Sequence, residues 1–333
     1  MIDEVLLEIQ HNFPLVKSPF LKIAQKFQTT ENEVIRILKE QKESGVIRQT
    51  SAIFDTKKLG YTSSLVAFCV DETNIEECAK NINTHPGVSH NYQRSHIYNL
   101  WFTIAVPPNS IIGLEKTVEY FASKAGVTDY LILPTKKMFK IAVKLDTTKQ
   151  KSLKEEMVKK TFSEITLTQE HYDLIELLQK DIEFIQEPFF WIIEKLGITY
   201  EKFFELFMEL QKSGVMRRFA SILNHKKAGF TSNAMVVWEI DDEKGDEIGS
   251  IASHFSAVSH CYLRPVFESW KYNLFTMIHA NSEKELENII EMMGNEIASK
   301  SNFILHSIKE FKKVRIIYFS NEFAIWEEKY AIS

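Results

Sequence analysis

Three features are scarce in this sequence: cysteine, long apolar segments and an excess of positive charge. The 333 residues contain only three cysteines, Cys69, Cys78 and Cys261, and no CxxC pair. An odd set of this kind is typical of reduced thiols in the cytoplasm, and it argues against an iron–sulfur or zinc site built on cysteine. We therefore expect a cytoplasmic protein with no resident metal.

Membrane and nucleic-acid functions are disfavoured in the same way. The longest apolar runs, around Ile104 and Met235, are far shorter than the ~20 residues that a membrane-spanning helix needs. The acidic N-terminus lacks the basic segment of a secretory signal. The formal net charge is −5, whereas proteins that bind DNA through its phosphates carry a local excess of Lys and Arg. The hydrophobic fraction of 44% can fill two sizeable cores.

Self-comparison shows two diverged copies of one unit. Residues 45–63 (GVIRQTSAIFDTKKLGYTS) return as residues 214–232 (GVMRRFASILNHKKAGFTS). Residues 88–94 (VSHNYQR) return as 258–264 (VSHCYLR), and the YNL of residues 98–100 returns at 272–274. The Lys-Lys pairs at 136–137 and 312–313 are matched as the close of the two copies. Blocks matched in the same order indicate an internal duplication.

Each copy is predicted to begin with a helix-turn-helix and to continue as an α+β domain. Thr30 caps a helix predicted over 31–43, Gly45 ends it, and the second copy repeats this helix over 200–212. Strands and helices then follow in the order βαββαβ, with the last strand at 139–145 and 315–319. This order is typical of a ferredoxin-like sandwich.

The predicted fold class is thus α+β, a tandem repeat of helix-turn-helix plus ferredoxin-like domains that form a pseudo-dimer within one chain. The helix-turn-helix domains are predicted at 1–50 and 169–219, and the ferredoxin-like domains at 51–146 and 220–333. A polar linker is predicted at 147–168, where Lys, Glu, Ser and Thr are frequent.

The HxYxR motif of each copy places three unusual side chains on one face of a strand, because residues i, i+2 and i+4 project together. The shared faces are His90, Tyr92 and Arg94 in the first copy and His260, Tyr262 and Arg264 in the second. Such a face is too polar for ordinary core and too aromatic for an ordinary solvated surface. The plainer alternative is a His and a Tyr satisfied by backbone partners beside a surface Arg.

Residues of these motifs carry a resemblance to a known family. A helix-turn-helix followed by βαββαβ resembles the Lrp/AsnC regulators. Residues 90–103 (HNYQRSHIYNLWFT) resemble the signature of one subunit type of siroheme decarboxylase. Residues 258–265 (VSHCYLRP) with 270–277 (WKYNLFTM) resemble the signature of the other subunit type. The chain would then be a natural fusion of the two subunit types.

The resemblance implies an activity on an iron tetrapyrrole. That activity is loss of carbon dioxide from the C12 and C18 acetates of siroheme, giving 12,18-didecarboxysiroheme on the routes to haem and haem d1. Siroheme is a flat apolar macrocycle rimmed by carboxylates, so its site needs apolar and aromatic walls with convergent cations. Guanidinium groups suit this role because they hold a carboxylate in a fork. The predicted substrate-binding residues are Arg48, Arg94, Arg217, Arg218, Arg264, Lys271, Tyr98, Tyr272, Trp101 and His225.

Decarboxylation also needs a proton donor for the new methyl carbon. Histidine suits this task because its ordinary pKa is about 6.5. The predicted catalytic residues are His90, His260, Tyr92, Tyr262 and His96, the histidines being either proton donors or iron-side ligands. The first hairpin is expected to contribute more to catalysis than the second, since it carries both His90 and His96. The other histidines, His11, His85, His171, His254, His279 and His306, are interpreted as structural or solvated.

No cofactor is expected beyond the iron tetrapyrrole substrate, because the macrocycle itself can accept the electron pair and no Gly-rich nucleotide loop is present. Two other functions stay open at this point: a DNA-binding regulator, and a tetrapyrrole sensor or carrier that does not react. The helices predicted at 31–43 and 200–212 are both net acidic, which disfavours contact with a duplex. Product analysis distinguishes a carrier from an enzyme.

Overall fold

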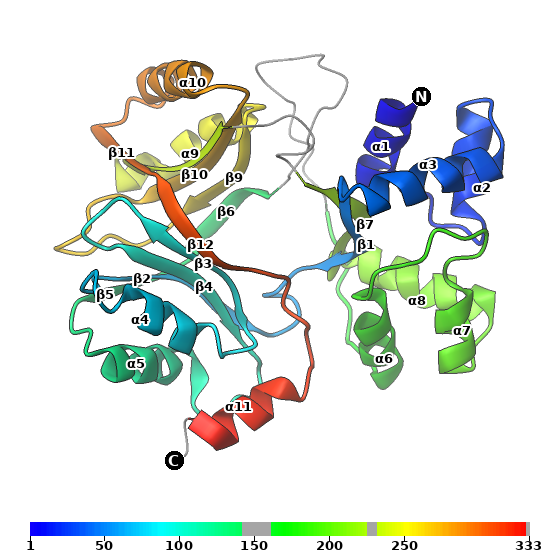
Figure 1. Cartoon of the computed structure of the whole chain (residues 1–333), viewed down its shortest axis with the longest axis horizontal. Helices are drawn as coiled ribbons and strands as arrows, with labels where there is room; N and C mark the ends of the chain where they lie inside the picture. The colour runs from blue at the N-terminus through cyan, green and yellow to red at the C-terminus, as the bar shows by residue number, and fades with distance from the viewer. Residues whose placement is uncertain (142–160, 225–231, 331–333) are drawn as a thin grey trace. The chain divides into compact units, whose positions relative to one another are not determined.

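The chain divides into two compact units in a computed structural model that describes residues 1–141, 161–224 and 232–330 (Figure 1). One unit contains residues 1–59 and 161–224 of the described ranges, and the other contains residues 60–141 and 232–330. The first unit holds both helix-turn-helix segments and the second holds both βαββαβ segments. Within the described part of the chain, no helix is long and apolar enough to cross a membrane.

The helix-turn-helix unit contains the same four elements twice. The first copy has α1 (Ile2–His11), α2 (Pro19–Lys26), α3 (Glu31–Glu43) and β1 (Ile47–Phe54). The second copy has α6 (Gln169–Leu178), α7 (Phe190–Leu196), α8 (Tyr200–Lys212) and β7 (Met216–Leu223). Strands β1 and β7 pair with each other in an antiparallel sheet, so the two copies share backbone hydrogen bonds.

The predicted helices at 31–43 and 200–212 are confirmed as α3 and α8. Thr30 and Thr199 cap them, each hydroxyl accepting a hydrogen bond from the backbone N–H three residues later. Gly45 and Gly214 follow the helices with φ of 72° and 71°, a left-handed conformation that glycine adopts without a steric penalty. Local signals therefore determine where both helices begin and end.

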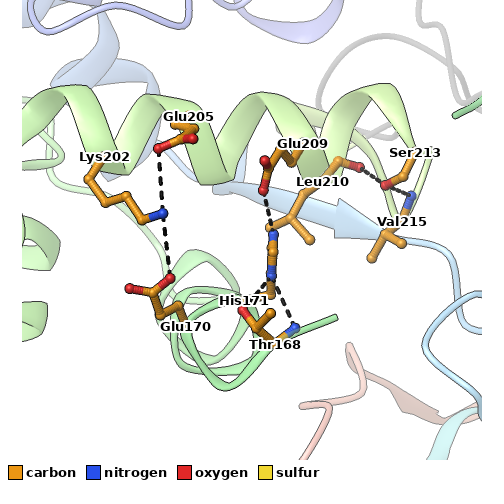
Figure 2. Close-up of polar contacts among 9 residues, drawn as sticks. All are labelled: Thr168, Glu170, His171, Lys202, Glu205, Glu209, Leu210, Ser213 and Val215. Atoms are coloured by element: carbon orange, nitrogen blue, oxygen red, sulfur yellow. Dashed lines mark hydrogen bonds and ion pairs between the residues drawn. The ribbon is translucent and has the colours of Figure 1, made fainter. Parts of the chain in front are cut away.

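His171 joins the start of α6 to α8 (Figure 2). Its Nδ1 accepts a hydrogen bond from the backbone N–H of Thr168 at 3.2 Å, so the ring proton of the neutral form lies on Nε2. That Nε2 donates to Glu209 on α8 at 2.9 Å. The prediction that His171 is structural is confirmed. Residues 161–168 of the predicted linker have no regular structure, and residues 147–160 lie outside the described residues.

In the sheet unit, the first ferredoxin-like domain has the strand order β3-β4-β2-β5. Its elements are β2 (Thr62–Phe68), α4 (Ile75–Ile82), β3 (Val88–Arg94), β4 (Leu100–Val106), α5 (Gly113–Ala125) and β5 (Tyr130–Pro134). Helices α4 and α5 cover one face of this sheet and enclose a hydrophobic core. The C-terminal helix α11 (Glu322–Tyr330) adds Trp326 to the same core.

The second ferredoxin-like domain repeats this arrangement with the order β11-β8-β10-β9. Its elements are β8 (Ser232–Glu239), the 3₁₀ turn η1 (Asp242–Lys244), α9 (Gly245–His254), β9 (Val258–Leu263), β10 (Leu274–Ala280), α10 (Glu283–Glu296) and β11 (Ser301–Leu305). The faces of the two sheets that carry no helices pack against each other. Phe275 and Val237 of one sheet and Leu65 and Leu133 of the other lie in this common core.

Each copy gives its final strand to the other copy's sheet. Strand β6 (Lys137–Ile141) pairs with β9, and β12 (Ser307–Lys313) pairs with β3, so each sheet gains a fifth strand within the described ranges. This exchange confirms a pseudo-dimer within one chain. The prediction that strands at 139–145 and 315–319 complete each copy's own sheet was wrong. Strands β5 and β11 fill that position, residues 315–319 form no strand, and residues 142–145 lie outside the described ranges.

The match between the Lys-Lys pairs at 136–137 and 312–313 was also wrong. Lys140 lies opposite Cys261 on β9, and Lys312 lies opposite Asn91, the corresponding residue of β3. The Lys140 Nζ donates to the carbonyl of Phe255 at 2.9 Å, and the Lys312 Nζ donates to that of Asn83 at 2.8 Å. Both ammonium groups thus bind carbonyls just beyond the first helix of the neighbouring domain, which makes Lys140 and Lys312 the equivalent pair.

Candidate functional site

A β-bulge lies at the serine before the first histidine of each motif. Between β3 and β4 the pairing shifts from Val88 opposite Ile104 to His90 opposite Thr103. Between β9 and β10 it shifts in the same way, from Val258 to His260. A bulge places an extra residue in one strand, bends it and changes the direction of a side chain, often beside a functional site.

The bulge brings each serine hydroxyl to its neighbouring imidazole. The Ser89 Oγ lies 3.0 Å from the His90 Nδ1 and 2.7 Å from the Thr103 Oγ1. The Ser259 Oγ lies 2.8 Å from the His260 Nδ1. Sequence reasoning missed both serines, although the VSH triplet of each matched block contains them.

The three residues of each HxYxR motif share one face, as the sequence predicts. The rings of His90 and Tyr92 are stacked with centroids 6.2 Å apart, and the Arg94 guanidinium lies 5.0 Å from the Tyr92 ring. In the second copy, the corresponding distances are 6.1 Å and 5.1 Å. We call these two sets the first row (His90, Tyr92, Arg94) and the second row (His260, Tyr262, Arg264).

Both arginines of the rows are buried, which the sequence did not predict. Arg94 is 5% exposed, and its Nη1 donates to the Leu305 carbonyl at 2.9 Å and to the Ser307 Oγ at 2.8 Å. Arg264 is 7% exposed, and its Nη1 donates to the Leu133 carbonyl. These partners lie where the chain passes from one sheet to the other. The arginines therefore brace the two strand crossovers.

The charges of Arg94 and Arg264 are not neutralised by the protein. Within the described part of the chain, neither guanidinium has a carboxylate partner, and the Nε of each has no hydrogen-bond partner. Burial lowers the pKa of both side chains to about 10. A buried cation is unfavourable unless an anion pairs with it. Each row therefore ends in a group suited to attract an anion.

The strands added by the exchange make the two rows different. In the first row, Glu310 lies opposite Tyr92 and accepts a hydrogen bond from its hydroxyl at 3.0 Å, and Lys313 lies opposite His90. In the second row, Met138 lies opposite Tyr262 and Ile141 lies opposite His260. The first row thus has a charged border and the second an apolar border.

Several of the aromatic residues predicted to bind substrate lie in the core between the sheets. Tyr98 and Trp101 are buried there, and the Trp101 Nε1 donates to the Tyr98 carbonyl at 2.6 Å. The Tyr98 hydroxyl contacts Asp129 at 2.9 Å and Ser269 at 2.8 Å, and burial raises its pKa. The ring of Tyr272 packs against that of Trp270 with centroids 5.1 Å apart.

His96 and Lys271 are each engaged by a neighbour. The His96 ring packs edge-on against Trp270 and Phe303, and burial lowers its pKa, which favours the neutral form. The Lys271 Nζ lies 2.8 Å from the Glu239 carboxylate, and this hydrogen bond raises the pKa of Lys271. The catalytic role predicted for His96 and the substrate contact predicted for Lys271 stay predictions.

The remaining predicted cations lie in the helix-turn-helix unit, whereas both rows lie in the sheet unit. Arg48 on β1 is exposed, and the Arg217 Nη2 lies 2.8 Å from the Asp55 carboxylate. Burial, and then the charge of Arg217, lower the pKa of Arg218. His225 lies outside the described residues. Two surface hollows, of about 570 Å³ on α10 and about 640 Å³ beside α3 and α7, contain none of the predicted site residues.

Burial keeps the thiols of Cys78 and Cys261 in their protonated form. All three cysteines are free, and burial raises the pKa of Cys78 and Cys261 to about 12. Both therefore stay protonated near neutral pH, a form that neither attacks nor ligates well. The described residues contain no group of three or more His, Cys, Asp or Glu side chains that could hold a metal ion.

Family models match both kinds of domain. A model of the AsnC-like ligand binding domain matches residues 58–140 and 227–312, once in each copy. A model of the siroheme decarboxylase NirDL-like helix-turn-helix domain matches residues 3–48. The chain is therefore a tandem protein of the AsnC-like class in which helix-turn-helix segments accompany two ligand-binding domains.

Individual relatives specify the family. The siroheme decarboxylase of Hydrogenobacter thermophilus is 40% identical over 97% of this chain and 96% of its own. The siroheme decarboxylase beta subunit of Methanosarcina barkeri is 35% identical over 43% of this chain and 94% of its own, as expected for a fusion. The crystal structure of the siroheme decarboxylase NirDL in co-complex with an iron-uroporphyrin III analogue is 35% identical, with a TM-score of 0.77, and the match covers 98% and 97% of the two chains. The chain belongs to the siroheme decarboxylase family, a family of carboxy-lyases in haem and haem d1 biosynthesis.

Proposed function

We propose that this enzyme removes the carboxyl groups of the C12 and C18 acetates of siroheme and releases 12,18-didecarboxysiroheme. The relative of known structure binds an iron-uroporphyrin III analogue, which is also a flat macrocycle. The observation that carries the proposal is the repeated row of His, Tyr and buried, unneutralised Arg on one face of each sheet.

The arginines supply the attraction for a polycarboxylate. Arg94 and Arg264 keep positive charge in a poorly hydrated place, where a carboxylate gains more from pairing than it would in water. An arginine that held the departing carboxylate too tightly would stabilise the ground state and slow the reaction. Arg94 and Arg264 therefore hold carboxylates that stay on the macrocycle and fix its orientation.

Each decarboxylation breaks one carbon–carbon bond and leaves its electron pair on the former acetate carbon. Carbon dioxide departs, the macrocycle delocalises the electron pair, and one proton then completes the methyl group. We assign the delivery of that proton to a histidine of the rows, His90 or His260, with Tyr92 or Tyr262 beside it as a relay. The Nδ1 of each histidine is engaged by a serine, so the proton is transferred from Nε2. Because the substrate accepts the electron pair itself, the reaction needs no S-adenosylmethionine, reductant or oxygen.

The direct test is anaerobic incubation of the purified enzyme with siroheme alone, followed by mass spectrometry of the tetrapyrrole. We expect loss of two carbon dioxide molecules per siroheme, with a singly decarboxylated species as an intermediate. Binding of siroheme without any change in its mass would show a carrier or sensor instead. Turnover that begins only when a reductant or radical initiator is added would refute the proposed role of the macrocycle.

A further inference from the structure

We propose that Ser259 and His279 position His260 for proton transfer, and that this makes the second row the one in which the chemistry occurs. This inference rests on the proposed decarboxylation and assigns it to one of two similar rows. His279 lies on β10, and its Nε2 is 2.8 Å from the Ser259 Oγ. Sequence reasoning had interpreted His279 as structural or solvated.

The proposed proton arrangement around Ser259 starts from the neighbours of its hydroxyl. The hydroxyl has one proton and three neighbours: the His260 Nδ1 at 2.8 Å, the His279 Nε2 at 2.8 Å and the Met277 carbonyl at 3.3 Å. We assign the hydroxyl proton to the Met277 carbonyl, which can only accept, so that Ser259 accepts from both imidazoles. His260 then carries its proton on Nδ1 in the neutral form and on both nitrogens in the charged form. The proton that His260 gives up is therefore always the one on Nε2, and no hydrogen bond has to rearrange.

The first row lacks this constraint. There the Ser89 Oγ contacts the Thr103 Oγ1 at 2.7 Å, and Thr103 occupies the position that corresponds to Met277. A threonine hydroxyl can donate or accept, so Ser89 can either donate to His90 or accept from it. Ala105 occupies the position that corresponds to His279. Neither tautomer of His90 is therefore enforced by the hydrogen bonds of Ser89.

The residues that border the two rows also favour the second row as the catalytic one. Met138 and Ile141 beside the second row are apolar and suit the face of a macrocycle. The first row is bordered by Glu310, whose carboxylate binds the Tyr92 hydroxyl and repels the carboxylates of the substrate, and by Lys313, which lies opposite His90 and carries the opposite charge. This assignment differs from the sequence-based expectation that the first hairpin contributes more to catalysis because it carries both His90 and His96; the His96 ring packs against the rings of Trp270 and Phe303.

Paired substitutions test this positioning role. Ser259→Ala and His279→Leu should lower kcat for siroheme by roughly 10- to 100-fold, the usual loss when a group that orients a functional histidine is removed. The dissociation constant of siroheme should change less than about threefold, because neither side chain is a carboxylate partner. His279→Gln should recover most of the activity, since its amide N–H can still donate to Ser259.

Two serine variants are the comparisons. Ser253→Ala removes a hydroxyl that donates only to the Ser250 carbonyl within α9, and it should leave kcat unchanged. Ser89→Ala should lower kcat several-fold less than Ser259→Ala does. Equal losses in Ser89→Ala and Ser259→Ala, or an inactive His279→Gln, would overturn the assignment to the second row.

A second measurement is independent of turnover. Imidazole ¹⁵N NMR should show the His260 proton on Nδ1 in the wild-type protein, and the tautomers should become mixed in His279→Leu. If wild-type enzyme fails to decarboxylate siroheme but this tautomer shift occurs, the proposed function fails and the positioning role stands. If siroheme is decarboxylated and the His260 tautomer does not respond to His279→Leu, the positioning role fails alone.

Discussion

Replacement of Arg94 and Arg264 by methionine separates a binding role from a structural one. Both guanidiniums are buried, lack a carboxylate partner within the described residues, and bind carbonyls at the strand crossovers. Methionine has a similar length and fills the same space without a charge. If the charge is kept for the substrate, its removal should weaken binding much more than folding.

The magnitude follows from two opposing contributions to folding. Burial lowers the pKa of each arginine from 12.5 to about 10, which means that the folded protein destabilises the charged form by about 3 kcal/mol. Methionine removes this penalty. It also removes the hydrogen bonds of the guanidinium, worth about 1.5–3 kcal/mol each when the donor is charged. These contributions largely offset each other, so the free energy of unfolding should change by no more than about 3 kcal/mol for each substitution.

For siroheme binding, no gain offsets the loss of the guanidinium charge. Loss of one partner from a desolvated charge pair typically costs about 2–5 kcal/mol, which is roughly a 30-fold or larger rise in the dissociation constant. An anaerobic absorption titration with siroheme measures binding, and urea unfolding followed by circular dichroism measures stability. Arg36→Met is the control, because Arg36 is exposed and pairs only with Glu33 and Glu40 on its own helix. Unchanged siroheme affinity together with a loss of several kcal/mol of stability would show that the arginines are structural clamps only.

Three further predictions concern the scaffold. Burial, and then the charge of Lys312, lower the pKa of His85 to about 3 in the folded protein. In the unfolded chain the pKa is about 6.5, so between these two pH values the unfolded chain binds a proton that the folded chain does not. Stability should therefore fall with decreasing pH in this window by up to about 1.4 kcal/mol per pH unit, and His85→Asn should reduce that slope in urea unfolding. His171→Ala should lower the free energy of unfolding by about 1–3 kcal/mol, because it breaks the hydrogen bond to Glu209. The control is Lys202→Ala, which removes only exposed ion pairs and should change the free energy of unfolding by less than about 1 kcal/mol in the same assay. Duplex DNA should not bind in a low-salt titration, since Arg36 on α3 is already paired with carboxylates; tight, salt-sensitive binding would contradict this.

Local signals in the sequence predicted the parts of the fold that depend on local structure. The bounds of α3 and α8 follow from the capping threonines and the terminal glycines, which act within one turn of the helix. The common face of His90, Tyr92 and Arg94 follows from the two-residue period of a strand.

Pairing between distant segments could not be predicted in this way. Strands β6 and β12 have the pattern of ordinary edge strands, and nothing within them indicates that they pair with the other copy's sheet. The burial of Arg94 and Arg264 follows from that exchange, because the crossovers cover them. The β-bulges at Ser89 and Ser259 are visible only when the pairing with β4 and β10 is known.

The double variant His90→Ala/His260→Ala tests the central claim most directly, in an anaerobic assay that measures siroheme turnover and siroheme binding together. If the rows deliver the proton, turnover should fall by about 10²–10⁴-fold, the usual range for a lost general acid, while the dissociation constant of siroheme changes much less. Full activity in the double variant would contradict the account and show that both histidines are structural.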